Sequence, residues 1–555
     1  MLNRKSFVRK INTLAFSVGV AFAALLVGCS SDKSTSQDPE QTLHMAFGAE
    51  PQTLDPHMAA GVPDLRLLAA IIEPLAELDP HTYEAVPALA KSWDISEDGL
   101  VYTFHLRENA KWSDGTPLTA QDFVFSWQRI LSPAIGGYYV QDYYNIVGAE
   151  DFNTGKSEDF TSVGVKAISN HALQFTLLKP DPLFAKRMAH ETVGPVQPAT
   201  ILKFGNIDDA TSKWTQPPNY VSNGPFVMTR WEINKVIVLE KNPHYWDAEN
   251  VKLEKIYAYP IEDIATEERM FRSGQIHVAW GGDIPTEKIE TYQKESPEKI
   301  IITPMYGTYF YIFNNQVAPF DNADVRRAFT YALDREMLTS KIAKGGKQPA
   351  TTLSLPVPHF NPDSPIEYNP QKAAEYLAKA GYPNGEGFPQ IALLYNTDEL
   401  HKKIAVAAQQ MWKKHLNVSI TLENQEWKFF LENRKNKTYT LARGGSISTF
   451  ADPIDFLQSY MTGHGMNDSD YRNSDFDALV NKALYELDPV KRGAYLEEAE
   501  ELLLNDAAIA PVLTYTEVFL KAPEVKNAIF SATAKPNYKD IYLDFSTTEK
   551  QPQSE

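Results

Sequence analysis

The chain has 555 residues and contains 53 Lys and Arg against 71 Asp and Glu, so its formal net charge is −18. This acidic balance argues against nucleic acid or an anionic membrane surface as the partner, because both require a basic patch. A single cysteine excludes an intrachain disulfide and a thiolate metal cluster. The length predicts two or three domains that are stabilised by their cores alone.

The first forty residues have the composition of an export signal followed by a tether. Four basic residues precede the uncharged, mostly apolar segment 11–28, which is also long enough for a single membrane anchor. Its ending, Leu-Val-Gly-Cys, resembles a bacterial lipobox, whose cysteine is lipidated. We therefore predict a lipoprotein signal peptide at 1–28, a lipidated Cys29 and a flexible polar tether at 29–40. The protein is then exported, periplasmic or at the cell surface, and anchored to a membrane that the sequence does not identify.

Strand-like and helix-like segments alternate along the body of the chain, which is typical of an α/β protein. The helix expected at 401–416 is amphipathic, with Ile404, Ala408 and Trp412 on one face and the lysines largely opposite. In chain order, we expect a strand at 102–112 and another at the start of 236–246. Three helices follow, one at 324–346, one that ends at Gly381 and one at 401–416, and then a strand at 418–422.

The stretch LARGGSISTFADP at 441–453 is unusual for a globular protein. Leu441 and Ala442 could close a buried strand, which Arg443 and two glycines then interrupt. Gly444 and Gly445 remove side chains where another backbone could approach. A charged residue beside such a gap is costly to bury without a partner, which raises the question of what Arg443 binds.

Catalysis is the weaker hypothesis. The segment NTGKS at 153–157 lacks the first glycine of a phosphate-binding loop, and GGSIS at 444–448 lacks the last glycine of a nucleophile elbow. The twelve histidines form no His-x-x-x-His pair, so a zinc hydrolase is not expected. We predict no enzyme activity, no metal and no cofactor.

From residue 41 onward the chain resembles the oligopeptide-binding proteins of bacterial ABC importers, which are solute-binding protein family 5. The order and spacing of the matching segments are specific, although each one alone is a weak motif. These segments are TLDPH at 53–57, the run from YTFHLRENAKW to SWQR at 102–129, NGPFVMTRW at 223–231, LEKNPHYWD at 239–247, NNQVAPF to ALDRE at 314–336, and LLYNTDELHKKIA to LENQEWKFFLENR at 393–434.

The resemblance implies an α/β, two-lobed periplasmic-binding-protein fold of type II, in the peptide-binding cluster, with an extra subdomain and a hinge. In this arrangement lobe I combines 41–72, 197–302 and 516–555, the extra subdomain is 73–196, and lobe II is 303–515. An extended peptide is trapped between the lobes and its backbone pairs with protein backbone. The implied partners are a peptide or peptide-like ligand and integral-membrane permease subunits, and the protein is expected to be a monomer.

By the same likeness, ARGG at 442–445 pairs with the ligand's main chain, and Arg443 joins two other residues in neutralising the ligand's carboxylates. The alternatives are that Trp427 is an ordinary core residue and that His401 is a surface residue at a helix start. The candidate ligand-binding residues are Gly61, Val62, Tyr138, Tyr139, His401, Trp427, Arg434, Arg443, Gly444, Gly445, Ser446, Thr449 and Asp452.

This sequence departs from the family pattern where the ligand's amine is held. Family members that take ordinary peptides usually have an aspartate at the place of Thr449, and an acidic residue at the place of Ala60. Losing such a partner costs several kcal/mol for a desolvated ammonium. We therefore hypothesise an altered ligand, such as one with a blocked or displaced amine or a cell-wall-derived peptide, unless Asp452 or Asp455 substitutes.

Three functions follow, in decreasing order of support. The first is a lipid-tethered receptor that delivers a peptide or peptide-like solute to a permease. The second keeps the fold but binds a sugar, haem or a nickel chelate, none of which would need the glycines at 444–445. The third is a signalling or scaffold lipoprotein that no longer transports.

Overall fold

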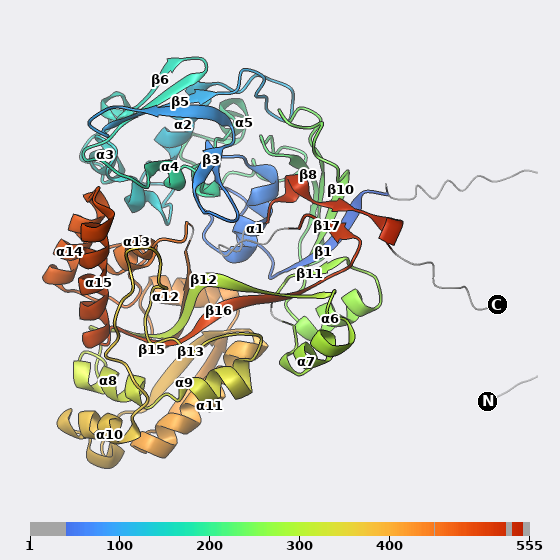
Figure 1. Cartoon of the computed structure of the whole chain (residues 1–555). Helices are drawn as coiled ribbons and strands as arrows, with labels where there is room; N and C mark the ends of the chain where they lie inside the picture. Colours follow the sequence, from blue (N-terminus) through green and yellow to red (C-terminus); the bar gives the residue numbers. More distant parts are fainter. Residues whose placement is uncertain (1–39, 283, 449, 529–535, 548–555) are drawn as a thin grey trace, which may run out of the picture. The chain divides into compact units, whose positions relative to one another are not determined.

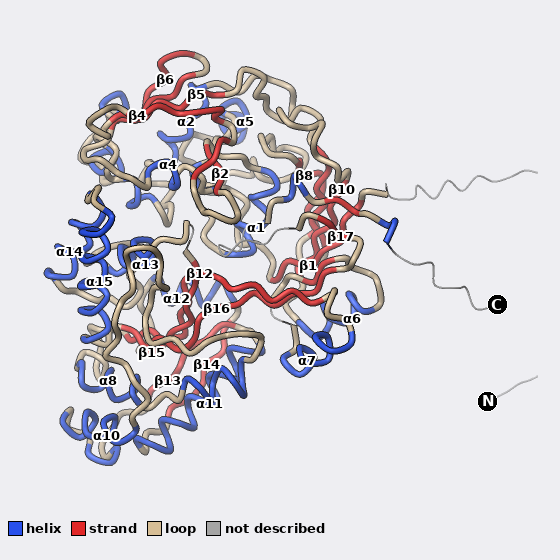
Figure 2. The backbone as a smooth tube through the Cα atoms, viewed as in Figure 1, coloured by secondary structure: helices blue, strands red, loops and turns tan. Residues whose placement is uncertain are grey.

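A ten-stranded mixed sheet forms the framework of the protein (Figures 1 and 2). The computed structural model describes residues 40–282, 284–448, 450–528 and 536–547. The predicted signal peptide, Cys29 and the predicted tether up to residue 39 lie outside the described residues, as does Thr449. In spatial order the strands are β14 (Ile420–Gln425), β13 (Ile391–Asn396), β15 (Leu441–Ile447), β12 (Ile300–Phe313), β16 (Ile509–Lys521), β11 (Val278–Ala279), β1 (Thr42–Gly48), β10 (Lys255–Pro260), β9 (Val236–Lys241) and β8 (Phe226–Glu232).

Two long antiparallel strands, β12 and β16, carry the sheet from one half of the protein to the other, as the paired green and red ribbons of Figure 1 show. Their register begins at Ile300 with Leu520 and ends at Ile312 with Ile509. It is irregular between Pro304 and Thr308, because a proline has no N–H for the ladder. The predicted boundary between lobes at 302–303 falls beside this irregularity.

The half of the sheet around β1 is covered on both faces. Leu43, Met45 and Phe47 alternate along β1 and enter one core with α1 (Val62–Ile71). Ala46 points to the other face, into a smaller core with Phe271. The helices on this second face are α6 (Ile264–Arg272) and α7 (Thr286–Glu295).

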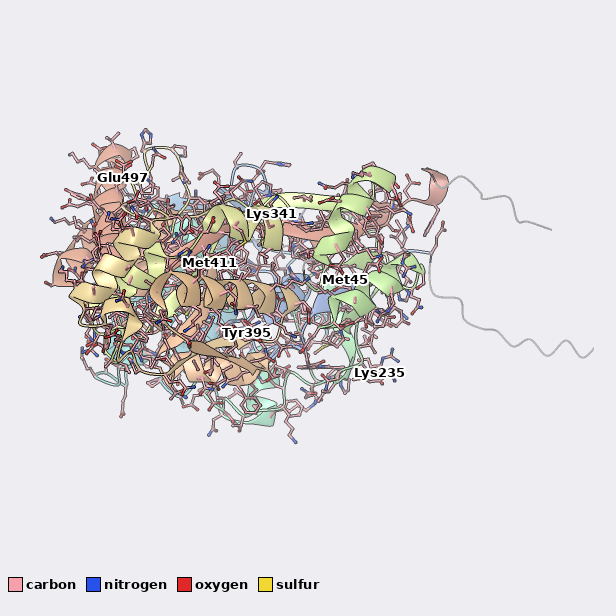
Figure 3. All side chains as sticks on the ribbon, turned by 90° about the horizontal axis from the view of Figure 1, so that it is seen from below. Met45, Lys235, Lys341, Tyr395, Met411 and Glu497 are labelled. Carbon is pink, nitrogen blue, oxygen red and sulfur yellow. The ribbon has the colours of Figure 1, made fainter. Side chains whose placement is uncertain are left out.

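The half around β13 and β15 is also enclosed by helices on both faces, as buried parallel strands require. As predicted, Ile404, Ala408 and Trp412 of α11 (Glu399–Leu416) are buried. Figure 3 shows α11 along its length, with Met411 labelled on it. The helices of this half are α8 (Ala323–Tyr331), α9 (Arg335–Met337), α10 (Pro370–Lys379), α11, α12 (Trp427–Lys435), α13 (Pro453–Leu457), α14 (Ser474–Tyr485) and α15 (Pro489–Asn505).

Smaller sheets complete the fold. The alternation predicted for the strand from residue 102 is confirmed, because Tyr102, Phe104 and Leu106 of β5 are buried beneath α2 (Ala120–Ile130). The four-stranded antiparallel sheet is β4 (Ala90–Ile95), β5 (Val101–Leu106), β7 (Ala172–Thr176) and β6 (Val165–Ser169). Two-stranded sheets pair β2 (Ala76–Leu78) with β3 (Ala85–Pro87), and β17 (Val525–Lys526) with β18 (Tyr542–Leu543). Short helices are α3 (Ala149–Asn153), α4 (Phe184–Arg187), α5 (Pro198–Phe204), η1 (Val140–Tyr143), η2 (Phe160–Ser162), η3 (Glu191–Val193), η5 (Pro383–Gly385), η6 (Gln458–Tyr460), η7 (Tyr538–Asp540) and η8 (Phe545–Thr547).

A buried ion pair joins two of the segments that carry the family resemblance. Arg129, at the end of 102–129, donates from Nη1 to Asp55 Oδ1 at 2.9 Å and from Nη2 to Asp55 Oδ2. Arg129 is fully buried. Burial by itself raises the pKa of the Asp55 carboxyl, but Arg129 outweighs it and holds the pKa below the usual value. These motif residues therefore stabilise the fold and do not line a ligand site.

His57 of the same segment is held neutral. Its Nδ1 lies 2.9 Å from Arg129 Nη1, which can only donate, so the ring proton is on Nε2, 3.1 Å from the Gly194 carbonyl oxygen. Burial, followed by the Arg129 charge, lowers the pKa of His57 to about 3. The imidazole thus acts as a structural hydrogen-bonding group.

The prediction of a single continuous helix at 324–346 is wrong, because the segment is divided into three helical elements. The chain leaves α8 after Tyr331, and the Asp334 side chain caps α9 by accepting from Met337 N at 2.9 Å. Buried Arg335 then donates to the carbonyls of Ala350 and Pro511, at 2.9 and 2.8 Å. A π-helix, η4 (Leu338–Ala343), follows, and the predicted stop at Gly345 and Gly346 is confirmed by φ angles of 61° and 80°. In the described part of the chain, no helix is both long and apolar enough to span a bilayer.

Candidate functional site

An open strand edge lies where β13 and β15 separate. These parallel strands pair only at Leu393 with Leu441 and at Leu394 with Ala442. Beyond this point β15 continues to Ile447, still paired with β12 on its other side. The expectation that Arg443 and the glycines interrupt the strand is therefore wrong. On the β13 side, no strand in the described residues pairs with 443–447, and diverging parallel strands are a common place for a ligand.

A cavity of about 400 Å³ lies against this edge, within the size range of ligand sites. Segments that are far apart in the sequence build it: the start of α1, the two tyrosines just before η1, the ends of β13 and β15, α12 and the strand β16. Of the candidate residues, Val62, Tyr138, Tyr139, His401, Trp427, Arg434, Arg443, Gly445 and Ser446 line it.

Three described candidates do not line the cavity. Gly61 lies just behind the lining, where a Cβ would be 3.3 Å from Trp427 Nε1. Gly444 faces the opposite side of β15, where a Cβ would lie 2.6 Å from Ile312 Cγ1. Asp452 caps α13, and Arg492 donates to both of its carboxylate oxygens at 2.9 and 2.6 Å. Its charge is therefore balanced within the protein.

The glycines at 444–445 are required by side-chain packing. A Cβ on Gly444 would overlap the Phe310 ring, and a Cβ on Gly445 would overlap the hydroxyl of Tyr515. The Tyr515 hydroxyl in turn accepts a hydrogen bond from Arg443 Nη2. Gly445 thus leaves room for the Tyr515 hydroxyl, which orients Arg443, and it places no side chain beside the strand edge.

Arg443 is a buried cation whose partners among the described residues are polar but not acidic. It is 8% exposed, and Nη1 lies 3.5 Å from Asn396 Oδ1. Its guanidinium stands 5.1 Å from the centre of the Tyr309 ring. Among the described residues its hydrogen-bond partners are the neutral side chains of Asn396 and Tyr515, and Nε has no acceptor. Because a buried charge without a counter-ion is costly, this end of the cavity favours an anion.

The positive charge of Arg443 also affects the pKa of His401. His401 lies in the first turn of α11, and its Nδ1 is 3.4 Å from Asp398 Oδ1 without hydrogen-bond alignment. Burial, then the charges of Arg443 and Lys347, lower the pKa of His401 well below its ordinary value. The neutral ring leaves Arg443 as the charge that a ligand anion meets at this end.

Arg434 stands in a different setting from Arg443. It pairs with Asp468 at 2.6 Å, so its positive charge is balanced inside the protein. The ring of Tyr138 lies beside it under Lys435, whose Nζ is 4.4 Å from the ring centre. On this wall the arginine is paired with a carboxylate, whereas Arg443 has only neutral partners among the described residues.

Sequence reasoning missed several lining residues, including Tyr515, Asn396 and Ser448. Tyr515 belongs to the strand pattern of β16, and nothing local distinguishes it from a structural residue. Its importance comes from a hydrogen bond to Arg443, which is 72 positions away in the sequence. Asn396 had a weak signal, as a polar residue at the end of a buried strand.

A buried carboxyl lies directly behind another part of the wall. Glu267 of α6 accepts a hydrogen bond from Gly281 N at 2.6 Å, and Gly281 lines the cavity. In the described part of the chain no donor reaches its Oε2. Burial raises the pKa of Glu267 to about 8, so the group is protonated near neutral pH.

We predict that Glu267→Gln flattens the pH dependence of stability. Between the ordinary carboxyl pKa and about 8, folded Glu267 holds a proton that the unfolded chain releases, so stability falls as pH rises through this window. A glutamine side chain does not titrate, so the variant does not lose stability as the pH rises through this window. Relative to wild type, the variant should gain about 3 kcal/mol between pH 5 and pH 8 in urea unfolding. The same substitution at exposed Glu249 should give no gain, and an equal gain there would contradict the interpretation.

These features define a class of protein, one with a ligand-sized cavity against an open sheet edge. The chain belongs to a family of that class, because the family model described as "Bacterial extracellular solute-binding proteins, family 5 Middle" matches residues 84–468. The chain is 38% identical over 498 residues to the periplasmic oligopeptide-binding protein OppA of Escherichia coli (strain K12), a match that covers 88% of this chain and 89% of that one.

Solved structures give the same result and confirm the predicted two-lobed α/β fold. The murein tripeptide binding protein MppA of Escherichia coli matches with a TM-score of 0.85 and 32% identity, covering 90% of this chain and 98% of that one. Haemophilus influenzae OppA in complex with RPPGFSPFR matches with a TM-score of 0.84 and 30% identity, covering 91% of this chain and 99% of that one.

The unliganded open form of MppA matches less well, with a TM-score of 0.65 at the same 32% identity, over 91% of this chain and 97% of that one. Because the identity is unchanged, the lower score reflects how the parts of MppA are arranged. The present structure is therefore nearer to the other MppA conformation than to the open one.

Proposed function

We propose that this protein captures peptides or peptide-like solutes outside the cytoplasm and delivers them to the permease of an ABC importer. The observation that carries the proposal is Arg443, a buried cation without an acidic partner in the described residues, beside the open edge of 443–447. A peptide offers both complements, a carboxylate for the guanidinium and backbone N–H and C=O groups for the strand edge. The peptide ligands in the names of its relatives support the same assignment. A sugar, haem or nickel chelate would leave the edge unused.

We propose that capture involves closure about β12 and β16. Their register irregularity between Pro304 and Thr308 lies at the predicted boundary of lobe II, which suits a hinge. The predicted extra subdomain and lobe II meet through His464 and Asp142, with Nε2 3.2 Å from Oδ1. Gly465 N also donates to Gln141 Oε1 at 2.6 Å. Ligand binding energy favours this closed form, which the permease then recognises.

The attachment of the protein is also part of the proposal. A lipid on Cys29 would hold the binding domain at a membrane, and the polar segment 29–40 would let it reach the permease. The functional unit is a monomer that needs no cofactor. Metabolic labelling with a fatty acid analogue should mark wild type and leave Cys29→Ser unmarked.

Native mass spectrometry of protein purified from its own envelope fraction tests the ligand class. We expect co-purified masses that correspond to short peptides, and their loss from Arg443→Met prepared in the same way. A single sugar, haem or metal chelate would overturn the proposal. A single N-blocked or cell-wall-derived peptide would keep the peptide function and support the altered ligand suggested by Thr449.

A further inference from the structure

In the described part of the chain, three arginines line the cavity, and their charges are balanced in different ways. Arg434 pairs with Asp468, which also lines the cavity. Arg443 has only neutral hydrogen-bond partners among the described residues. Arg66 of α1 pairs with Glu517 of β16, from Nη2 to Oε1 at 2.7 Å. Glu517 is outside the lining, so it reaches Arg66 from behind the cavity wall.

The side chain of Arg66 is held by several contacts besides this ion pair. Its guanidinium lies 3.9 Å from the centre of the Trp280 ring, and its Nη1 donates to the Trp280 carbonyl oxygen. The indole Nε1 of Trp280 in turn donates to Glu517 Oε1. All three side chains are buried. A guanidinium that is both stacked and paired has little freedom to turn toward another anion.

The ion pair lies within one predicted lobe. Arg66, Trp280 and Glu517 fall in the three segments assigned to lobe I, 41–72, 197–302 and 516–555. We therefore expect Arg66 to keep its counter-ion when the lobes separate. A ligand that enters the open cavity meets this arginine already neutralised.

A second acid close to Arg66 does not replace Glu517. Burial raises the pKa of Glu267 to about 8, although the hydrogen bond from Gly281 N and the charge of Arg66 both lower it. Glu267 is thus protonated near neutral pH and carries no charge. Glu517 is the acid that balances Arg66 under these conditions.

We propose that Glu517 determines the charge specificity of the cavity, because it neutralises Arg66 and so disfavours ligands with a carboxylate side chain at the lobe I wall. The inference rests on the proposed function and concerns which peptides are accepted. A carboxylate that approaches Arg66 must compete with Glu517 for the guanidinium and is repelled by it at short range, away from bulk water. Glu517 does not line the cavity and acts through Arg66.

The test uses two synthetic random libraries of peptides of three to five residues, with free and N-acetylated amines. The libraries differ in one side chain: each peptide carries one glutamine in the first library and one glutamate in the second, with no other acidic side chain. Competition for the full mature protein, read by native mass spectrometry, gives the ratio of affinities. Wild type should favour the glutamine library by about 10-fold or more at the position nearest Arg66.

Glu517→Gln should shift this ratio by about 30-fold toward glutamate, while the glutamine peptides keep their affinity within about 3-fold. The variant retains the shape of the side chain and an oxygen that can accept from Arg66 and Trp280, so the fold should be preserved. In the double variant Glu517→Gln with Arg66→Met the shift should disappear, because the freed guanidinium is then absent. Exposed Glu249→Gln changes the net charge equally and should behave as wild type.

The remaining outcomes each contradict a stated part. If wild type binds both libraries equally, or Glu517→Gln leaves the ratio unchanged, the assigned specificity is wrong and peptide binding stands. If Glu517→Gln weakens both libraries alike, Glu517 is a structural residue. If the double variant keeps the shift, Arg66 is not the group through which Glu517 acts. If wild type binds neither library, the proposed function fails, and the inference with it.

Discussion

Replacing Arg443 with methionine is expected to weaken the binding of peptides with a free carboxylate by about 100-fold or more. The guanidinium is buried, and in the described part of the chain it has neutral partners only, so a ligand carboxylate gains a charged hydrogen-bonded pair away from water. The same substitution should raise the stability of the ligand-free protein by about 1 kcal/mol, because it removes a buried charge without a counter-ion. Loss of affinity with gain of stability distinguishes a ligand-binding arginine from a structural one.

The Arg443 experiment uses one peptide in two forms, with a free carboxylate and with a C-terminal amide. Wild type should favour the carboxylate form, whereas Arg443→Met should bind both forms with similar, low affinity. Arg472→Met is the matched control, since Arg472 is exposed and pairs with Asp470 at 2.9 Å. If Arg443→Met loses stability and keeps its preference for the carboxylate, Arg443 is a structural residue and the proposed anchoring is wrong.

Replacing Asp55 with alanine is expected to destabilise the fold by about 3–5 kcal/mol. The substitution leaves Arg129, which is fully buried, without its bidentate carboxylate partner. It also removes the acceptor for Trp214 Nε1, at 3.3 Å. A deeply buried guanidinium cannot be resolvated without opening the core, so the cost exceeds that of an exposed pair.

Urea unfolding followed by tryptophan fluorescence measures this loss, because Trp214 lies within the affected core. Asp94→Ala is the control. The Asp94 side chain, which pairs with His105, is 79% exposed, so the loss of this pair should cost well under 1 kcal/mol. The double variant Asp55→Leu with Arg129→Met should recover part of the loss, since no charge is then left buried. A loss below about 1 kcal/mol in Asp55→Ala would contradict a structural role for the TLDPH segment.

Periodic patterns in the sequence were sufficient for elements whose burial follows a simple repeat. The period-two alternation of β5 and the apolar face of α11 were predicted because each repeat depends only on neighbouring residues. The helix expected at 324–346 failed because Arg335 binds carbonyls at Ala350 and Pro511. Such long-range contacts override local helix propensity and leave no mark in the local pattern.

The sequence by itself determined the family and the acidic composition, and it drew attention to an arginine beside two glycines. Only the tertiary structure decided which of these groups face a ligand. It placed Asp452 against Arg492 and Asp455 in the cavity lining, and set the Tyr515 hydroxyl over Gly445. The physical reason is that the effect of a charged group depends on its neighbours. Arg492 balances the charge of Asp452, whereas Arg443 has only neutral partners among the described residues, and none of these neighbours is adjacent in the sequence.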